Sequence, residues 1–232
     1  MGWYAKPRGG WSTEDNEAQQ NMFMISEYLQ NNGWTMIAIA GLLGNMANES
    51  GFNPWRWNSD TVGLNTRAYG LVQFYPASYY IGGRGTESMI TNYSPNMSTS
   101  SQTAGATPQD GLAQLQVMEI FHSDKFFNRA SYCHYADISG CYPYTAFKTQ
   151  TDLWLATVGW LFNYEFPAAS DREYADAYSR YQKAIRCYEI ITGSPPPEPP
   201  DPPVPPTPTT RPKPPLFFYC IRKFRQKKGL LV

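Results

Sequence analysis

The sequence between Thr35 and Glu49 is the feature that most constrains how this chain folds. It reads MIAIAGLLGNMAN and is apolar on nearly every side of a helix. Such a helix has to be buried on all sides, so the rest of the domain must surround it. Thr35 suits its N-cap, and we predict that it runs to about Asn48. Gly41 and Gly44 each cost about 1 kcal/mol relative to alanine in a helix, which indicates close approach by another helix or by a bound molecule.

Apolar residues at helical spacing predict further helices on both sides of this segment. The first begins near Ser12 or Thr13, has acidic residues in its first turn, and ends at residues 31–33. The later helices are predicted over residues 108–121, 123–131, 151–163 and 171–192. The last of them carries a stripe that is predicted to be a core face: Tyr174, Tyr178, Tyr181, Ile185 and Tyr188.

Residues 50–86 are rich in glycine, proline, asparagine and aromatic residues, which predicts a loop with a short β-hairpin. Residues 87–107 are polar and are expected to be irregular. The expected fold class is therefore mainly α within an α+β arrangement. It consists of a helical domain with a small loop or β-hairpin lobe.

A proline-rich run divides the chain into three parts. Residues 194–215 contain 13 prolines in 22 positions, which no packed helix or strand tolerates. We expect a polyproline II linker that rises about 3.1 Å per residue. One folded domain is expected over residues 1–193. Residues 216–232 are a short apolar and basic tail, which either docks on a partner or an anionic surface or stays unstructured.

Charge is distributed unevenly, although the formal net charge is zero. Residues 1–193 carry −5 and residues 216–232 carry +5. A mildly acidic domain argues against nucleic acid as the substrate. No apolar run reaches the ~18 residues that a membrane-spanning helix needs, so no stable membrane span is expected. The first twelve residues lack the apolar stretch of a signal peptide, so delivery outside a cell would need another route.

The four cysteines show no CxxC spacing. Cys133 and Cys141 with His122 and His134 fit no common zinc-finger spacing, so a disulfide between the two cysteines is favoured over a metal site. That disulfide requires an oxidising compartment. Cys187 falls within a predicted helix and is expected to be a buried thiol. No metal and no other cofactor is expected.

Glu49 follows the apolar helix directly and precedes an aromatic loop that contains Trp55 and Trp57. Apolar surroundings and the negative end of a helix dipole both oppose ionisation of a carboxyl group. A carboxyl group that keeps its proton is what cleavage of a glycosidic bond needs from its general acid. The aromatic content of 16% suits a sugar ligand, because ring faces contact the C–H side of a sugar. For any single tryptophan, a core position is the alternative.

Several short motifs occur in a characteristic order. Residues 42–46 read LLGNM, residues 49–54 read ESGFNP, residues 69–73 read YGLVQ, and residues 163–167 read NYEFP, followed by Arg172. Together they resemble the phage tail lysozymes, over about residues 12–192. The second and third motifs are also similar to those of lytic transglycosylases and goose-type lysozymes. The resemblance implies a lysozyme-like fold.

The resemblance also implies roles for individual residues. Glu49 is the general acid, and Ser50 and Gln73 bond sugar substituents or the acid itself. Tyr164 approaches Glu49 from the distal helix. A structural brace, in which Glu165 pairs with Arg172, is favoured over a catalytic role for Glu165. Further candidates for contact with the sugar are Tyr69, Trp55 and Trp57.

A second catalytic carboxylate is harder to identify. Asp60 is the best candidate for the base of an inverting hydrolase, which lies about 6.5–9.5 Å from the acid. A turn-forming role for Asp60 in Asn58-Ser59-Asp60 is at least as plausible. Without a second acid, the chemistry becomes that of a lytic transglycosylase, which releases a 1,6-anhydro sugar.

The resemblance implies a phage virion enzyme that cleaves the MurNAc–GlcNAc β-1,4 bond of bacterial peptidoglycan. It would act on the host cell wall from the tail tip, during DNA injection, with other tail or knob proteins as partners. One alternative is an endolysin that acts at host lysis. An alternative of another class is a non-catalytic structural or glycan-binding tail protein that keeps the fold.

Overall fold

A computed structural model describes residues 3–6, 8–58, 66–77, 109–120, 122, 125–166 and 174–197. The described part is mainly helical, which confirms the predicted fold class. Its α-helices are α1 (Asn16–Asn31), α2 (Met36–Glu49), α6 (Gln109–Ile120), α7 (Tyr144–Lys148), α8 (Leu153–Trp160) and α9 (Tyr174–Thr192). Two 3-10 turns (Ala130–Tyr132 and Ser139–Cys141) and a π-helical segment (Leu161–Glu165) lie between them.

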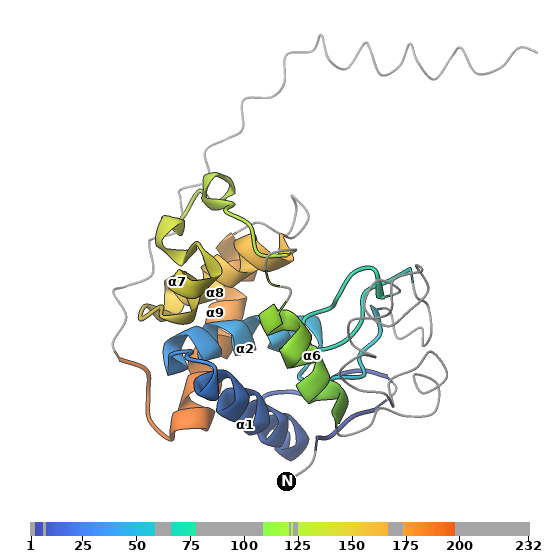
Figure 1. The fold of residues 1–232 in the computed structure, drawn as a ribbon. Helices are drawn as coiled ribbons and strands as arrows, with labels where there is room; N and C mark the ends of the chain where they lie inside the picture. Colours follow the sequence, from blue (N-terminus) through green and yellow to red (C-terminus); the bar gives the residue numbers. More distant parts are fainter. Residues whose placement is uncertain are drawn as a thin grey trace, which may run out of the picture.

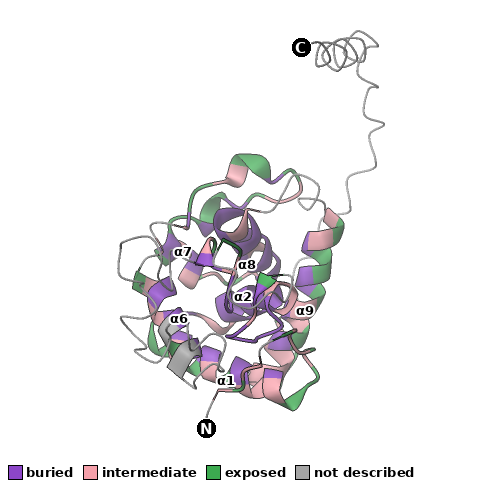
Figure 2. Ribbon diagram, turned by 90° about the vertical axis from the view of Figure 1, so that its right-hand side faces the viewer, coloured by how far each residue is buried: buried purple, intermediate pink, exposed green. Residues whose placement is uncertain are grey.

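Helix α2 is the centre of the molecule, as its sequence predicts. Figure 1 shows it enclosed by α1, α6, α8 and α9, and Figure 2 shows that its residues are almost all buried. The side chain of Thr35 caps the helix by accepting a hydrogen bond from the Ala38 amide at 3.1 Å. The only carboxylate of α2 therefore lies at the C-terminal end of a buried helix, and the packing of that helix determines where the carboxylate lies.

The two glycines of α2 let its neighbours approach closely. A Cβ atom on Gly41 would lie 2.6 Å from the Cβ of Ala156 on α8. A Cβ atom on Gly44 would lie 2.6 Å from the backbone oxygen of Arg180 and 2.7 Å from the Cβ of Ala184, both on α9. The close neighbours that we predicted from these two glycines are thus the helices α8 and α9.

The buried face of α9 differs from the tyrosine stripe that we predicted. Its buried residues are Ala177, Arg180, Tyr181, Ala184 and Cys187. Of the predicted stripe only Tyr181 is fully buried, and the side chain of Tyr178 is 39% exposed. The close approach to α2 selects small residues at the contact, so the other large rings lie on its flanks.

The predicted helix over residues 123–131 is also wrong. Residues 126–129 have no regular structure, and a 3-10 turn follows them. The amide of Phe127 donates to the backbone oxygen of Asn163 at 2.9 Å, so this segment is hydrogen-bonded to the π-helical segment after α8 rather than within itself. Helix α7 and the turn Ser139–Cys141 were not predicted.

The loop lobe after α2 contains isolated β-bridges instead of a regular hairpin within its described residues. Tyr69 pairs with both Trp57 and Phe74. Gln114 of α6 ties the two parts of this lobe together, because it accepts from the Leu71 amide at 2.7 Å and donates to the Pro54 carbonyl at 2.6 Å. Asp60, residues 87–107 and the tail over 216–232 lie outside the described residues.

An N-terminal arm, residues 3–6 and 8–12, packs against the start of the loop lobe. Two fully buried asparagines hold it. Asn21 bonds both the amide and the carbonyl of Tyr4, at 2.9 and 2.8 Å. Asn53 donates to the carbonyls of Lys6 and Gly9, at 2.8 and 2.7 Å. The arm is thus part of the structure that positions the residues directly after Glu49. Of the helices described here, none is long and apolar enough to cross a membrane.

Candidate functional site

Glu49 is the last residue of α2 and forms an ion pair with Arg180 of α9. The distance from Arg180 Nη2 to Glu49 Oε1 is 2.8 Å. The Arg180 side chain is 8% exposed and the Glu49 side chain is 24% exposed. The carboxylate therefore has access to solvent, while its cationic partner comes from the core.

Arg180 is held in place by two further side chains. Its Nη1 donates to Oδ1 of the buried Asn45 at 3.1 Å, and its Nε donates to Asp176 at 3.0 Å. Asn45 lies one turn before Glu49 on α2, and its amide nitrogen bonds the carbonyls of Gly41 and Thr157. Burial alone would lower the pKa of Arg180, but the charges of Glu49, Asp176 and Glu165 raise it. The guanidinium is therefore a fixed cation between acids.

Glu165 is the second carboxylate of the site. It ends the π-helical segment that continues α8, in which the Phe166 amide donates to the Leu161 carbonyl five residues earlier at 2.9 Å. The Glu165 carboxylate accepts a hydrogen bond from the indole of Trp160 at 3.1 Å. The following residue, Phe166, is left-handed with φ of 44°. A π turn and a left-handed residue both cost energy and are frequent at functional sites.

The surroundings of Glu165 oppose its ionisation. Burial raises the pKa of Glu165 to about 8, and the neighbouring charge of Glu49 acts in the same direction. The charge of Arg180 and the hydrogen bond from Trp160 lower it in part. Two carboxyl groups near one guanidinium thus differ in their surroundings, since Glu49 has the direct ion pair and Glu165 does not.

Backbone strain marks each of the three main motifs. Among the described residues other than glycine, positive φ occurs at Phe52 (60°), Gln73 (48°) and Phe166 (44°). These residues belong to ESGFNP, YGLVQF and NYEF respectively. Left-handed backbone at bulky residues costs of order 1–3 kcal/mol each and persists where the surrounding structure enforces it.

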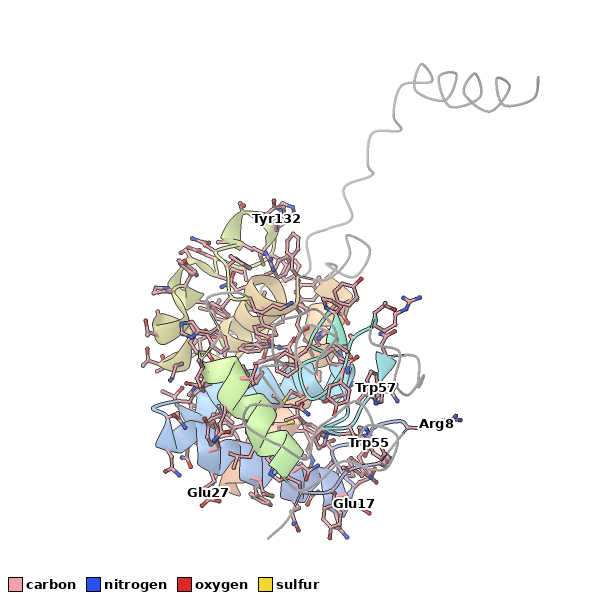
Figure 3. All side chains as sticks on the ribbon, turned by 45° about the vertical axis from the view of Figure 1, so that its right-hand side comes forward. Arg8, Glu17, Glu27, Trp55, Trp57 and Tyr132 are labelled. Carbon is pink, nitrogen blue, oxygen red and sulfur yellow. The ribbon has the colours of Figure 1, made fainter. Side chains whose placement is uncertain are left out.

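Most of the predicted sugar-contacting residues are core residues in the structure. Ser50 is 1% exposed and donates to the Met46 carbonyl, and Tyr69 and Trp57 are fully buried against each other with ring centroids 4.5 Å apart. Trp55 is 4% exposed. Figure 3 shows Trp55 and Trp57 in the loop lobe, at a distance from Tyr132 on the helical side. These residues build the loop that follows Glu49. Both tryptophans occupy core positions, which is the alternative to sugar contact named in the sequence analysis.

Gln73 and Tyr164 are also placed by the structure. The amide nitrogen of Gln73 donates to the Gly70 carbonyl at 2.9 Å, so this half-buried side chain braces its own turn. The ring of Tyr164 stacks on Trp160, with centroids 4.3 Å apart and planes 16° apart. Trp160 also bonds Glu165, so Tyr164 supports the residue that orients the second carboxylate.

An exposed aromatic patch continues from Phe166. We call it the Arg129 patch, and it consists of Phe127, Arg129, Tyr132 and Phe166. The Arg129 guanidinium lies 4.0 Å from the Phe166 ring centroid, and the Tyr132 ring meets Phe166 edge-on at 5.0 Å. Phe127 and Tyr132 are 45% and 48% exposed. Rings of this kind suit the C–H faces of sugars, and a guanidinium suits carboxylates.

Sequence reasoning missed Arg180 and Asn45 and favoured a structural role for Glu165 over a catalytic one. Arg172, its predicted partner, and Asp60 both lie outside the described residues. One signal was available: an asparagine inside an otherwise apolar helix has to find buried hydrogen-bond partners. Asn45 does so through Arg180.

The described part of the chain offers no cluster of three or more metal-binding side chains. Cys133, Cys141 and Cys187 are buried free thiols. Burial raises the pKa of Cys141 to about 11, so this thiol is unreactive at neutral pH. The favoured disulfide between Cys133 and Cys141 is not formed in the structure, and the expected buried thiol at Cys187 is observed.

Comparison with known proteins identifies relatives of this chain. The model of the phage tail lysozyme family matches residues 20–191. Morphogenesis protein 1 of Bacillus phage B103 is 43% identical over 65 residues. That stretch is 28% of this chain and only 18% of the relative, so the chain spans a small part of that protein's length. The family match extends over more than half of the chain and includes Glu49, Glu165 and Arg180, so the chain belongs to the phage tail lysozyme family.

Proposed function

We propose that this protein is a phage peptidoglycan hydrolase that cleaves the β-1,4 bond between N-acetylmuramic acid and N-acetylglucosamine. The observation that carries the proposal is the convergence of Glu49, Glu165 and Arg180 from α2, the π-helical segment and α9. Two carboxyl groups in different surroundings are the usual equipment of a glycosidase. Family membership supports a bacterial cell wall as the substrate.

Glu49 acts as the general acid in this proposal. It gives a proton to the glycosidic oxygen, the bond from that oxygen to C1 of MurNAc breaks, and GlcNAc leaves with a free hydroxyl. Water then adds its oxygen to C1 and returns one proton to Glu49, which leaves a reducing end. In the lytic transglycosylase variant the C6 hydroxyl of MurNAc attacks C1 instead, returns its proton to Glu49, and leaves a 1,6-anhydro end.

The Arg129 patch supports a glycan substrate. It adjoins Glu165 along the chain and presents exposed rings around a guanidinium. Peptidoglycan offers the matching groups, namely sugar faces and the carboxylates of its peptide stems. We call Glu49 and Glu165 the acid pair, and we propose that the glycan strand runs over the Arg129 patch next to it.

We further propose that the protein is a virion component that opens the host wall from the phage tail. The description of the family as tail lysozymes and the name of the phage B103 relative, a morphogenesis protein, support this placement. Immunodetection in purified virions tests it. Detection in lysates alone would favour the lysis-stage endolysin.

The decisive experiment for activity is Glu49→Gln assayed on purified peptidoglycan. Glutamine keeps the shape of the side chain and cannot donate a carboxyl proton, so we expect activity to fall at least about 100-fold, the lower end of the range for loss of a general acid. Mass spectrometry of the wild-type digest identifies the product, because reducing and 1,6-anhydro ends differ by one water.

Glu27→Gln is the matched control, since Glu27 is an exposed glutamate on α1 that lies away from the loop with Trp55 and Trp57 in Figure 3. It should retain full activity. Undiminished cleavage by Glu49→Gln would refute the assignment. Wall binding by the wild type without any released sugar ends would instead support the non-catalytic tail protein.

A further inference from the structure

Basic residues gather on the N-terminal arm and on the loop lobe that follows Glu49. Residues 1–12 contain two basic residues and no acidic one, and residues 50–77 contain two basic residues and one acidic one, Asp60. The intervening residues 13–49 contain five acidic residues and no lysine or arginine. The arm and the loop lobe thus carry positive charge within a domain whose net charge is negative.

Three of these cations and one indole surround Gly9, and we call them the arm cluster: Lys6, Arg8, Arg56 and Trp11. The Lys6 ammonium lies 4.5 Å from the centroid of the Trp11 ring. A Cβ atom on Gly9 would lie 3.8 Å from Arg56 Nη1 and 3.9 Å from Lys6 Cε, so these two side chains flank the glycine. Arg8 directly precedes Gly9 and is exposed, and Figure 3 shows it projecting outward on the side of the loop lobe. Gly9 is left-handed, with φ of 68°, a conformation that glycine adopts without strain.

The backbone of the arm cluster is hydrogen-bonded to two of the sequence motifs. The buried side chain of Asn53, in ESGFNP, bonds the Lys6 amide at 3.3 Å and the carbonyls of Lys6 and Gly9 at 2.8 and 2.7 Å. The Arg56 amide donates to the Asn53 carbonyl at 3.1 Å, and the Arg56 carbonyl accepts from the amide of Gly70, in YGLVQ, at 2.8 Å. The cations therefore keep a fixed position relative to the loop that follows Glu49.

The acidic residues that follow the arm in the sequence have partners of their own. Arg186 of α9 donates to both carboxylate oxygens of Glu14, each at 2.8 Å. The Asp15 carboxylate accepts a hydrogen bond from the Ser12 amide at 2.9 Å. These two carboxylates are thus engaged at the start of α1, and their charges are directed to groups other than the arm cluster.

Building on the proposed function, we propose that the arm cluster binds anionic groups of the cell wall, namely the carboxylates of peptide stems or the phosphodiesters of wall polymers. A guanidinium group suits both, because its planar donors bond two oxygens of a carboxylate or a phosphate at once, and the Lys6 ammonium adds a compact charge. The Trp11 ring offers an apolar face beside that ammonium. A group bound here is held beside the loop that follows Glu49, so the cluster selects glycan that carries anionic groups over bare glycan.

A triple variant of the full chain that combines Lys6→Gln, Arg8→Gln and Arg56→Gln tests the proposal. Sedimentation with purified walls measures the Kd, and every protein in this assay also carries Glu49→Gln so that the walls stay intact. Exposed ion pairs change an affinity by roughly 1.5- to 5-fold each, so we expect the Kd of the triple variant to rise at least about tenfold. Raising the ionic strength from about 0.15 M to about 1 M should weaken binding by the parent and leave the triple variant nearly unchanged, because salt screens exposed charges.

Two controls separate the charge of the cluster from the folding of the arm. Lys6→Arg combined with Arg56→Lys keeps every charge and should bind walls within about twofold of the parent, the range of one exposed ion pair. Arg186→Gln removes an exposed cation from α9 and should keep the parent Kd, whereas Arg8→Gln, which removes the same charge from the cluster, should raise it. An equal loss of affinity in Arg186→Gln and Arg8→Gln overturns the proposal, because net charge alone would then explain the binding.

Chemically altered walls identify the anionic group. Hydrofluoric acid removes phosphodiester polymers, and amidation with a carbodiimide and glycinamide neutralises carboxylates. The difference between the parent and the triple variant should vanish on walls that have had both treatments, and the single treatment that removes most of it names the group. A difference that persists on doubly treated walls, or a triple variant that binds untreated walls as tightly as the parent, overturns the proposal. Binding through the cluster by a chain with Glu49 intact that releases no sugar ends refutes the proposed function instead, so the two failures are distinguishable.

Discussion

Glu165 lies in surroundings that oppose its own ionisation, and this affects folding stability. Its pKa is raised from 4.5 to about 8 by burial and by Glu49, so the native state binds this proton more tightly than the unfolded state. Between these two values the unfolded state releases the proton first. Stability therefore falls as the pH rises through this window, and the loss is complete above about 8.

Glu165→Gln should remove this loss. The difference in unfolding free energy, variant minus wild type, should be about 1–3 kcal/mol larger at pH 8.5 than at pH 5. This is less than the full ~1.4 kcal/mol per pKa unit that linkage allows. Urea denaturation at both pH values measures it. An equal difference between the two proteins at both pH values would contradict the prediction. A stabilising substitution at this position would also be typical of a functional residue.

At the residue scale, the sequence predicts the groups that act locally and misses those that act across the fold. Glu49 was predicted from the apolar helix before it and the motif after it. Arg180 lies 131 residues away from Glu49, and nothing in the spacing of the two indicates their contact. Glu165 was noticed in its motif but paired with Arg172, because the nearest basic residue in sequence is a natural choice when the packing is unknown.

At the scale of elements, the crossing of α2 and α9 connects stability to the site. Gly44→Ala adds a methyl group where a Cβ atom would lie 2.6 Å from the Arg180 backbone oxygen and 2.7 Å from the Ala184 Cβ. We expect α9 to move outward and to carry Arg180 with it. Overpacking of this kind costs about 1–3 kcal/mol, from which the better helix propensity of alanine, about 1 kcal/mol, is subtracted.

Thermal unfolding and wall-cleaving assays of Gly44→Ala should show both a lower Tm and lower activity. Gly140→Ala is the control, since a Cβ atom there meets nothing within 4 Å and the backbone is not left-handed. Loss of stability with fully retained activity would show that α9 is not the element through which Arg180 is positioned.

The elements that the sequence predicted well are those with strong local signals. The apolar helix with its threonine cap forms as expected, and α6 begins within a residue of its prediction. The segment 123–131 has helical spacing of apolar residues, yet its backbone bonds to Asn163 far along the chain. The π-helical turn has no sequence signature of its own, because it arises from the fit between α8 and the residues that follow.

At the scale of the whole molecule, the family match over residues 20–191 leaves a segment at each terminus. The structure gives the N-terminal segment a definite role. The N-terminal arm satisfies the buried amides of Asn21 and Asn53, and the Trp11 amide donates to the Gly51 carbonyl at 3.0 Å, two residues after Glu49. The C-terminal segment begins with a proline-rich run that follows every residue placed in the site.

Removal of the two segments should therefore have opposite consequences. Deleting residues 194–232 is expected to leave the Tm nearly unchanged and the cleavage of isolated peptidoglycan within about twofold, because all groups of the acid pair precede residue 194. Deleting residues 1–12 should lower stability by at least about 2 kcal/mol, since buried amide groups that lose their partners cost about 1–3 kcal/mol each. It should also reduce activity, because the loop that follows Glu49 loses its support.

Differential scanning calorimetry and a turbidity assay on purified walls compare the two truncations with the full chain. Equal effects of both deletions would show that the arm contributes nothing specific to the site. A large loss of activity on isolated walls after removal of residues 194–232 would place part of the substrate-binding surface in the tail rather than on the helical domain.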